Sequence, residues 1–197
     1  VSFRTDASTN FGKDNRYGKF YSISGAWLVS SEKFMQKQKA LSFLKLRLSY
    51  GTSGKEAGID YLNYTLYAIG KDYEDYYREH PLYPSSYPAV INQLGNDQLT
   101  WETAYTFNLG VDMGFLNDRI RLNADYYRRR NSDLIMSVAT AAAIGVGAQY
   151  KNVGEMLNQG VELTLNTHTL KSPTFNWYTT FTFSHNKNEL TKLYDIL

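Results

Sequence analysis

The chain has 197 residues, a formal net charge of +2, no cysteine and a mean hydropathy of −0.45. The nearly balanced charge disfavours a nucleic-acid partner, and the lack of cysteine excludes disulfides and thiolate metal sites. No apolar run approaches the roughly 18 residues of a membrane helix, which excludes a helical membrane protein. A membrane β-barrel remains possible, because half of the strand residues of such a barrel are polar and its mean hydropathy is therefore low.

Alternation of apolar and polar residues predicts seven β-strands. In chain order they cover residues 1–6, 21–29, 44–50, 101–115, 120–129, 161–166 and 175–184. The first is weakly patterned and the fourth is the longest. One face of the fourth strand is almost wholly apolar and carries Trp101, Thr103, Tyr105, Phe107, Leu109, Val111, Met113 and Phe115. Residues 30–39 predict a short helix, because serines precede it and Glu32 lies in its first turn.

The connections between these strands are of two kinds. They fall near residues 8–16, 31–42, 52–98, 116–119, 131–158 and 168–174. The third and fifth are long, whereas the fourth and sixth are short. In an up-and-down meander the odd connections lie at one end and the even ones at the other. Long loops at one end and tight turns at the other are typical of outer-membrane barrels.

Strand length favours a barrel over a soluble β-sandwich. Strands of globular proteins usually have about five or six residues. Fifteen residues span roughly 50 Å, or about 35 Å of height at a 45° tilt, which crosses a bilayer. Trp27 and Trp177 are expected near the tight-turn end and Trp101 near the long-loop end, as in interfacial aromatic girdles. The apolar face should then contact lipid, and the opposite face should be wet.

Seven strands do not close a usual bacterial barrel, which has an even number and at least eight. An open sheet in lipid would leave edge backbone groups unsatisfied, at several kcal/mol each. The chain also begins within a predicted strand, and residues 188–197 resemble the start of an outer loop. We therefore expect a fragment of a larger barrel that does not fold by itself.

Four stretches together resemble consecutive barrel blocks of SusC/RagA-type TonB-dependent outer-membrane transporters. They are FRTDASTNFGKDNRYGKFYSISGAWLVSSEKF, LSFLKLRLSYGTSGK, LTWETAYTFNLGVDMGFLNDRIRLNADYYRRRNSDLI and NVGEMLNQGVEL. The resemblance implies a 22-strand barrel with a plug domain. Residues 1–197 would be a partial barrel domain from its later half, without the plug. It also implies a SusD-like surface lipoprotein, the TonB complex acting through parts outside this segment, and oligosaccharide or peptide cargo.

Two sets of residues are candidate contacts in such a transporter. The predicted loop 52–98 is rich in tyrosines, whose rings suit sugars, peptides or a protein lid, but could equally pack the loop on itself. These are Tyr61, Tyr64, Tyr67, Tyr73, Tyr76, Tyr77, Tyr83 and Tyr87. The second set consists of charged residues that are expected to face the lumen or the plug. They are Glu102, Asp112, Arg121, Asp125 and Arg129.

With residues 116–119 as a turn, Asp112 is expected to face Asn123, with Arg121 one diagonal away. This charged group is expected to be a structural pair, a plug contact, or both. No catalytic residue, cofactor or metal is expected, since the three histidines lack metal-ligand spacing. Three alternatives stay open: a passive outer-membrane porin, an outer-membrane enzyme, and a soluble β-sandwich surface adhesin.

Overall fold

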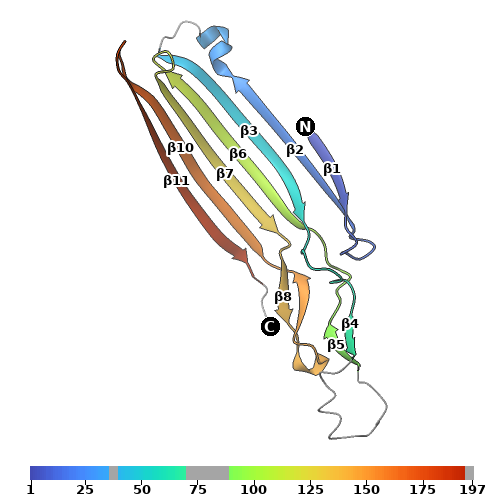
Figure 1. Ribbon diagram of the computed structural model, residues 1–197. Coiled ribbons are helices and arrows are strands. Elements are labelled where there is room, and N and C mark those ends of the chain that lie inside the picture. The colour runs from blue at the N-terminus through green and yellow to red at the C-terminus, as the bar shows by residue number, and fades with distance from the viewer. Residues whose placement is uncertain (36–39, 70–88, 194–197) are drawn as a thin grey trace, which may run out of the picture.

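The computed structural model describes residues 1–35, 40–69 and 89–193. Its main body is one antiparallel sheet of seven strands in the order β1-β2-β3-β6-β7-β10-β11 (Figure 1). The strands are β1 Ser2–Ala7, β2 Tyr17–Leu28, β3 Leu41–Lys55, β6 Glu102–Phe115, β7 Ile120–Ser132, β10 Glu155–Lys171 and β11 Asn176–Lys192. All seven predicted strands and their meander order are therefore confirmed. Within the described residues the sheet is not closed, and β1 and β11 form its two edges.

Two hairpins lie within the two long connections, at the same end of the sheet (Figure 1). One pairs β4 Leu66–Ile69 with β5 Ala89–Gln93, and the other pairs β8 Ile135–Ala139 with β9 Ala148–Asn152. A short 3₁₀ turn, η4 Ala142–Ile144, joins β8 to β9. Within the described ranges, no helix has the length and apolarity needed to cross a membrane.

Two expectations about local structure were wrong. Residues 30–39 do not begin an α-helix, because the chain forms two 3₁₀ turns, η1 Val29–Ser31 and η2 Lys33–Met35. Glu32 between them has extended backbone angles, and its carboxylate accepts a hydrogen bond from the Trp27 indole at 3.0 Å. Residues 36–39 lie outside the described part. Residues 188–197 were expected to start an outer loop; residues 188–192 instead continue β11 as far as Lys192, and residues 194–197 lie outside the described part.

The tight turn between β6 and β7 sets the register of both strands. Phe115 pairs with Ile120, so Asp112 pairs with Asn123 as expected. The turn requires positive φ angles at Leu116, Asn117 and Asp118, which are uncommon for residues other than glycine. The turn is also bonded to the strands on both sides. The Ser42 hydroxyl on β3 donates to the Asp118 carboxylate and accepts the Asp118 N–H, both at 3.0 Å. On the other side, the Arg119 carbonyl accepts the N–H of His168 on β10 at 2.7 Å.

The sheet has an apolar face and a polar face, and it is a single layer. Large side chains of the apolar face are exposed, among them Leu48 at 51%, Leu109 at 43% and Phe181 at 59%. In a β-sandwich a second sheet would cover such a face. In the described ranges the two further sheets are only short two-stranded hairpins. The apolar face therefore needs a partner outside these residues, and lipid is one that suits it.

Candidate functional site

The first, third and fifth connections meet at one end of the sheet and form a small folded unit, which we call the loop platform. It comprises residues 8–16, 56–69, 89–101 and 133–154 among those described. Phe11, Leu62 and Leu99 form its core and are 1%, 2% and 0% exposed, respectively. Ile135 and Tyr150 from the fifth connection pack against them. Each connection contributes apolar side chains, so none of the three is ordered by its own residues alone.

Trp101 belongs to this platform rather than to a lipid-facing girdle, which corrects the expectation for that residue. Its ring lies 5.2 Å from that of Phe11 and 5.8 Å from that of Phe20. Its indole N–H donates to the carbonyl of Arg16 at 3.2 Å. The reason is that β6 begins at Glu102, so the alternation of the strand does not fix the direction of Trp101.

Asn152 makes three side-chain hydrogen bonds, two of which join the fifth connection to the third. Its carboxamide oxygen accepts the Thr100 N–H at 2.8 Å, and its amide nitrogen donates to the carbonyls of Thr100 at 2.9 Å and Asp133 at 2.8 Å. Nearby, the Gln149 amide donates to the Gly95 carbonyl at 2.8 Å. These bonds satisfy backbone groups that no strand ladder pairs, which is what an irregular loop needs to be ordered.

Three of the candidate tyrosines lie on the platform. Tyr61, Tyr64 and Tyr67 each have more than half of their surface exposed, whereas Leu62 between them is buried. Gln93 holds this segment by donating to the carbonyls of Tyr61 at 2.8 Å and Tyr64 at 3.4 Å. The backbone of the segment is therefore fixed while its rings point to solvent. The remaining candidates, Tyr73, Tyr76, Tyr77, Tyr83 and Tyr87, lie outside the described residues.

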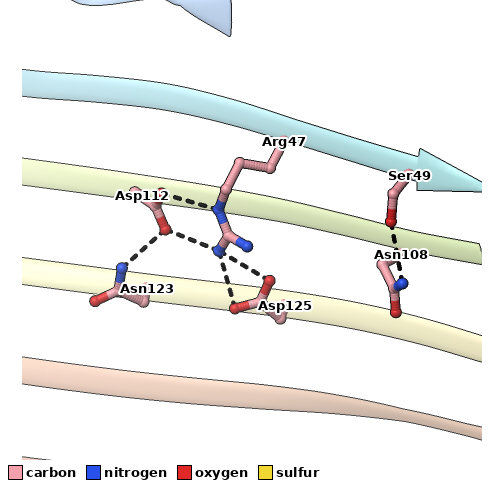
Figure 2. A network of polar contacts seen from close by, with 6 residues as sticks. All are labelled: Arg47, Ser49, Asn108, Asp112, Asn123 and Asp125. Carbon is pink, nitrogen blue, oxygen red and sulfur yellow. Dashed lines mark hydrogen bonds and ion pairs between the residues drawn. The ribbon is translucent and has the colours of Figure 1, made fainter. Parts of the chain in front are cut away.

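A network of charged and polar side chains crosses three strands on the polar face (Figure 2). The Arg47 guanidinium on β3 donates to both carboxylate oxygens of Asp112 on β6, each at 2.9 Å. It also reaches Asp125 on β7, at 2.9 and 3.1 Å from the two oxygens. Asn123 donates to Asp112 at 2.8 Å. One guanidinium thus holds two carboxylates, with the planar, two-pronged geometry that arginine allows.

Gly110 makes this arrangement possible, because Arg47 must pass over β6 to reach β7. Gly110 is the residue of β6 that lies between Arg47 and Asp125 in the register. A Cβ atom there would lie 2.6 Å from the Arg47 guanidinium carbon and 2.5 Å from an Asp125 oxygen. Because Gly110 has no side chain, the Arg47 guanidinium has room to pass over β6 and reach Asp125.

The structure does not bring the other charged candidates into this network. Glu102 lies at the start of β6, where its carboxylate accepts the Ile135 N–H at 2.9 Å and thereby anchors the loop platform. Arg121 donates to Asp118 at the tight turn, at 3.1 Å. Arg129 donates to Asn131 at 3.2 Å. The candidate set is therefore spread over the whole height of the sheet.

Arg47 was absent from the candidate set, although its alternation with leucines puts it on the polar face. The sequence signal that could have found it is charge balance, since Asp112 and Asp125 share that face and need a cation. Arg47, Asp112 and Asp125 form a network of fixed charges, not a nucleophile paired with a base. The network can hold strands in register and present oxygen acceptors to a partner.

Comparison with known proteins agrees with this architecture. Residues 1–195 match the family described as TonB dependent receptor-like, beta-barrel. The chain is 36% identical to the TonB-dependent receptor SusC of Bacteroides thetaiotaomicron over 98% of its own length and 19% of that protein. It is 34% identical to the TonB-dependent receptor P26 of Formosa agariphila, over 96% of the chain and 18% of that protein.

Solved structures give the same result. The chain superposes on the RagAB peptide importer in its open-open state with a TM-score of 0.84 at 32% identity, over 99% of the chain and 20% of that structure's chain. The chain thus spans about one fifth of the length of the relatives it matches. Seven meandering strands, one apolar and one polar face, and this match over nearly every residue lead to one conclusion: the chain belongs to the TonB-dependent receptor-like β-barrel family.

Proposed function

We propose that residues 1–197 form part of the barrel wall and outer loops of an active outer-membrane importer. The observation that carries this proposal is the single-layered sheet, with an uncovered apolar face, a polar opposite face and all long connections at one end. In this reading the segment is a partial barrel domain, and the plug belongs to other parts of the protein. The family is one of transporters, and we propose transport rather than catalysis.

The proposed topology follows from the faces and the connections. The apolar face contacts lipid, and the polar face lines the lumen of a multi-pass barrel in the outer membrane. The loop platform lies outside the cell and the turn at 116–119 lies in the periplasm. Asp112 and Asp125 then face the lumen, where the plug of such a receptor would sit. Arg47 fixes their position, so that any basic group of a plug meets preorganised carboxylates.

The proposed partners are a SusD-like surface lipoprotein, the TonB complex through other parts of the protein, and an oligosaccharide or peptide as cargo. Peptide is supported by one of the similar structures, which is described as a peptide importer. The exposed rings of Tyr61, Tyr64 and Tyr67 offer apolar plates with hydrogen-bonding tips. Such rings suit a lid, a sugar face or a peptide, and the platform beneath them keeps their backbone fixed.

The proposal is tested by uptake in a strain that expresses the complete receptor. Labelled peptides and oligosaccharides are supplied separately, with and without a functional TonB. Uptake of one cargo class that requires TonB supports the proposal, whereas uptake that persists without TonB indicates a passive porin. Replacing Tyr61, Tyr64 and Tyr67 together by alanine should reduce uptake at low cargo concentration. Phe34→Ala is the control, since it removes an exposed ring from the connection between β2 and β3 at the other end of the sheet.

A further inference from the structure

Two arginines interrupt the apolar face of β7. Ile120, Leu122, Ala124 and Tyr126 alternate on this face, and Arg128 and Arg130 continue the same alternation toward the loop platform. The pairing confirms this side of the sheet, because Arg128 lies opposite Phe107 and Arg130 lies opposite Tyr105 on β6. On the other side of β7, Arg128 lies opposite Gln159 of β10. Both guanidiniums thus lie on the face that is otherwise apolar.

The arginines line an aromatic groove of about 710 Å³. Its walls are Tyr50, Tyr105, Phe107, Tyr126, Arg128 and Arg130, which come from three adjacent strands. The rings of Phe107 and Tyr126 lie 6.4 Å apart in an edge arrangement. The groove therefore combines flat apolar plates with two guanidinium groups.

The two guanidiniums differ in their partners. Arg130 donates to Glu155 at 2.8 Å, so its charge is balanced within the sheet. Arg128 makes no hydrogen bond or ion pair with any residue in the described ranges. One positive charge on the apolar face thus has no counter-charge in this part of the chain. A cation that faces lipid without an anion is unfavourable, so an anion from the surroundings is the expected partner.

The height of the groove indicates where that anion comes from, given the topology of the proposed function. Ten residues of β6 separate Phe115 from Tyr105. At about 3.3 Å per residue and a tilt near 40°, they span about 25 Å, which is the height of the apolar band of such barrels. With Phe115 at the inner edge of the band, Tyr105 and its partner Arg130 lie at the outer edge. Arg128 lies about 5 Å deeper, within reach of that edge for an extended arginine side chain.

We propose that this groove binds the phosphate group of an outer-leaflet lipid, with Arg128 as the principal contact and Arg130 as a second. A planar guanidinium fits two phosphate oxygens at once, and the donors of Arg128 are unoccupied among the described residues. The aromatic walls pack against the sugar or the first methylene groups of the same lipid. The inference rests on the proposed function for one point, namely which end of the sheet lies outside the cell. The groove itself would lie on the lipid-facing side of the sheet in any barrel.

The test uses the complete receptor, purified in detergent and stripped of lipid. Lipid A, dephosphorylated lipid A and inorganic phosphate are added separately, and bound lipid is counted by native mass spectrometry. We expect phosphorylated lipid A to bind at least fivefold more tightly than the dephosphorylated form, from the contribution of one arginine near a membrane surface. Inorganic phosphate at the same concentration should not displace the lipid, because it lacks the parts that pack on the rings.

Arg128→Gln should lower lipid A affinity about fivefold, to the level of the dephosphorylated lipid. Arg129→Gln is the matched control, because it makes the same charge change one residue away on the opposite face. Equal binding of the two lipids by the parent protein would overturn the proposal without relying on any variant. Equal lipid A binding by the parent and Arg128→Gln would also overturn it. A change of oligomeric state in this variant without a change in bound lipid would overturn it as well, because it would indicate a second copy of the receptor on this face.

This experiment is independent of transport, because no cargo or TonB is present. Absence of uptake with intact lipid A binding would contradict the proposed function alone. Preference for the inner-leaflet phospholipid phosphatidylglycerol over lipid A would overturn the outer-leaflet assignment.

Discussion

Replacing Asn152 by alanine should loosen the loop platform without disturbing the sheet. Asn152 makes three side-chain hydrogen bonds, two to Thr100 and one to Asp133, at 2.8 to 2.9 Å. Alanine leaves the Thr100 N–H and two carbonyls without these partners. The two bonds to Thr100 are partly buried and the bond to Asp133 is exposed, so water replaces some of what is lost.

The magnitude follows from the number and kind of bonds. A typical hydrogen bond contributes about 1 kcal/mol net, and a buried group left unsatisfied costs about 1–3 kcal/mol. Two partly buried bonds and one exposed bond therefore give a loss of about 2–4 kcal/mol in the free energy of local opening. Since 1.4 kcal/mol is a factor of ten, the Thr100 amide should exchange about 30-fold to 1,000-fold faster.

The assay is hydrogen–deuterium exchange of the complete receptor in lipid nanodiscs. The peptides that contain Thr100 and Asp133 should lose protection, whereas peptides from the middle of β6 should not change. Gln98→Ala is the control, because among the described residues the Gln98 side chain bonds only to its neighbour Asp97 on the surface. If Thr100 in Asn152→Ala exchanged within twofold of its rate in the parent, the proposal that Asn152 joins the two connections would be refuted.

Four further predictions concern the sheet, its network and its ends. Leu109→Arg should destabilise the complete receptor by about 2–4 kcal/mol in urea titrations of vesicle-inserted protein, because it places a charge in lipid near the middle of the band. Gly110→Ala should cost about 1 kcal/mol in the same titration, because its methyl group displaces the Arg47 guanidinium from partners that are themselves partly exposed. Hydrogen bonds from Ser42 and Arg121 lower the pKa of Asp118, so this carboxylate stabilises the turn at pH values above its unfolded pKa of about 3.9. The hydrogen-exchange protection of residues 116–119 should therefore fall as the pH drops below that value toward the folded pKa. Protease added to intact cells should cut within residues 52–98, whereas a tag inserted at Asn117 should stay protected.

Each of these has a control. Asn108→Arg adds the same charge on the polar face and should cost far less than Leu109→Arg; equal costs would contradict the assignment of the two faces. In a background of Arg47→Met, Gly110→Ala should cost nothing further. Asp118→Asn should remove the pH dependence of the turn, and an unchanged dependence would mean that another group titrates there. Cleavage at Asn117 with protection of residues 52–98 would reverse the topology.

The alternation of the sequence was sufficient for the seven strands of the main sheet and, within those strands, for the face on which each side chain lies. Period-two patterning determines these properties because a strand turns successive side chains to opposite sides. The tight turn after Phe115 also fixed the register of β6 against β7, so the Asp112–Asn123 pair could be predicted. A turn of four residues leaves no freedom to slide one strand past the other.

Only the tertiary structure decided which residues from distant parts of the chain meet. The contact of Arg47 with Asp112 joins residues that are 65 positions apart and separated by a long connection. Alternation gives the face of Arg47 but not its height against β6, because a long loop does not fix register. The same reason explains the core of Phe11, Leu62 and Leu99, whose connections lack a repeating pattern and meet only because the strands bring their ends together. Trp101 follows that core rather than the period of β6, since beyond the end of a strand the direction of a side chain is set by what it packs against.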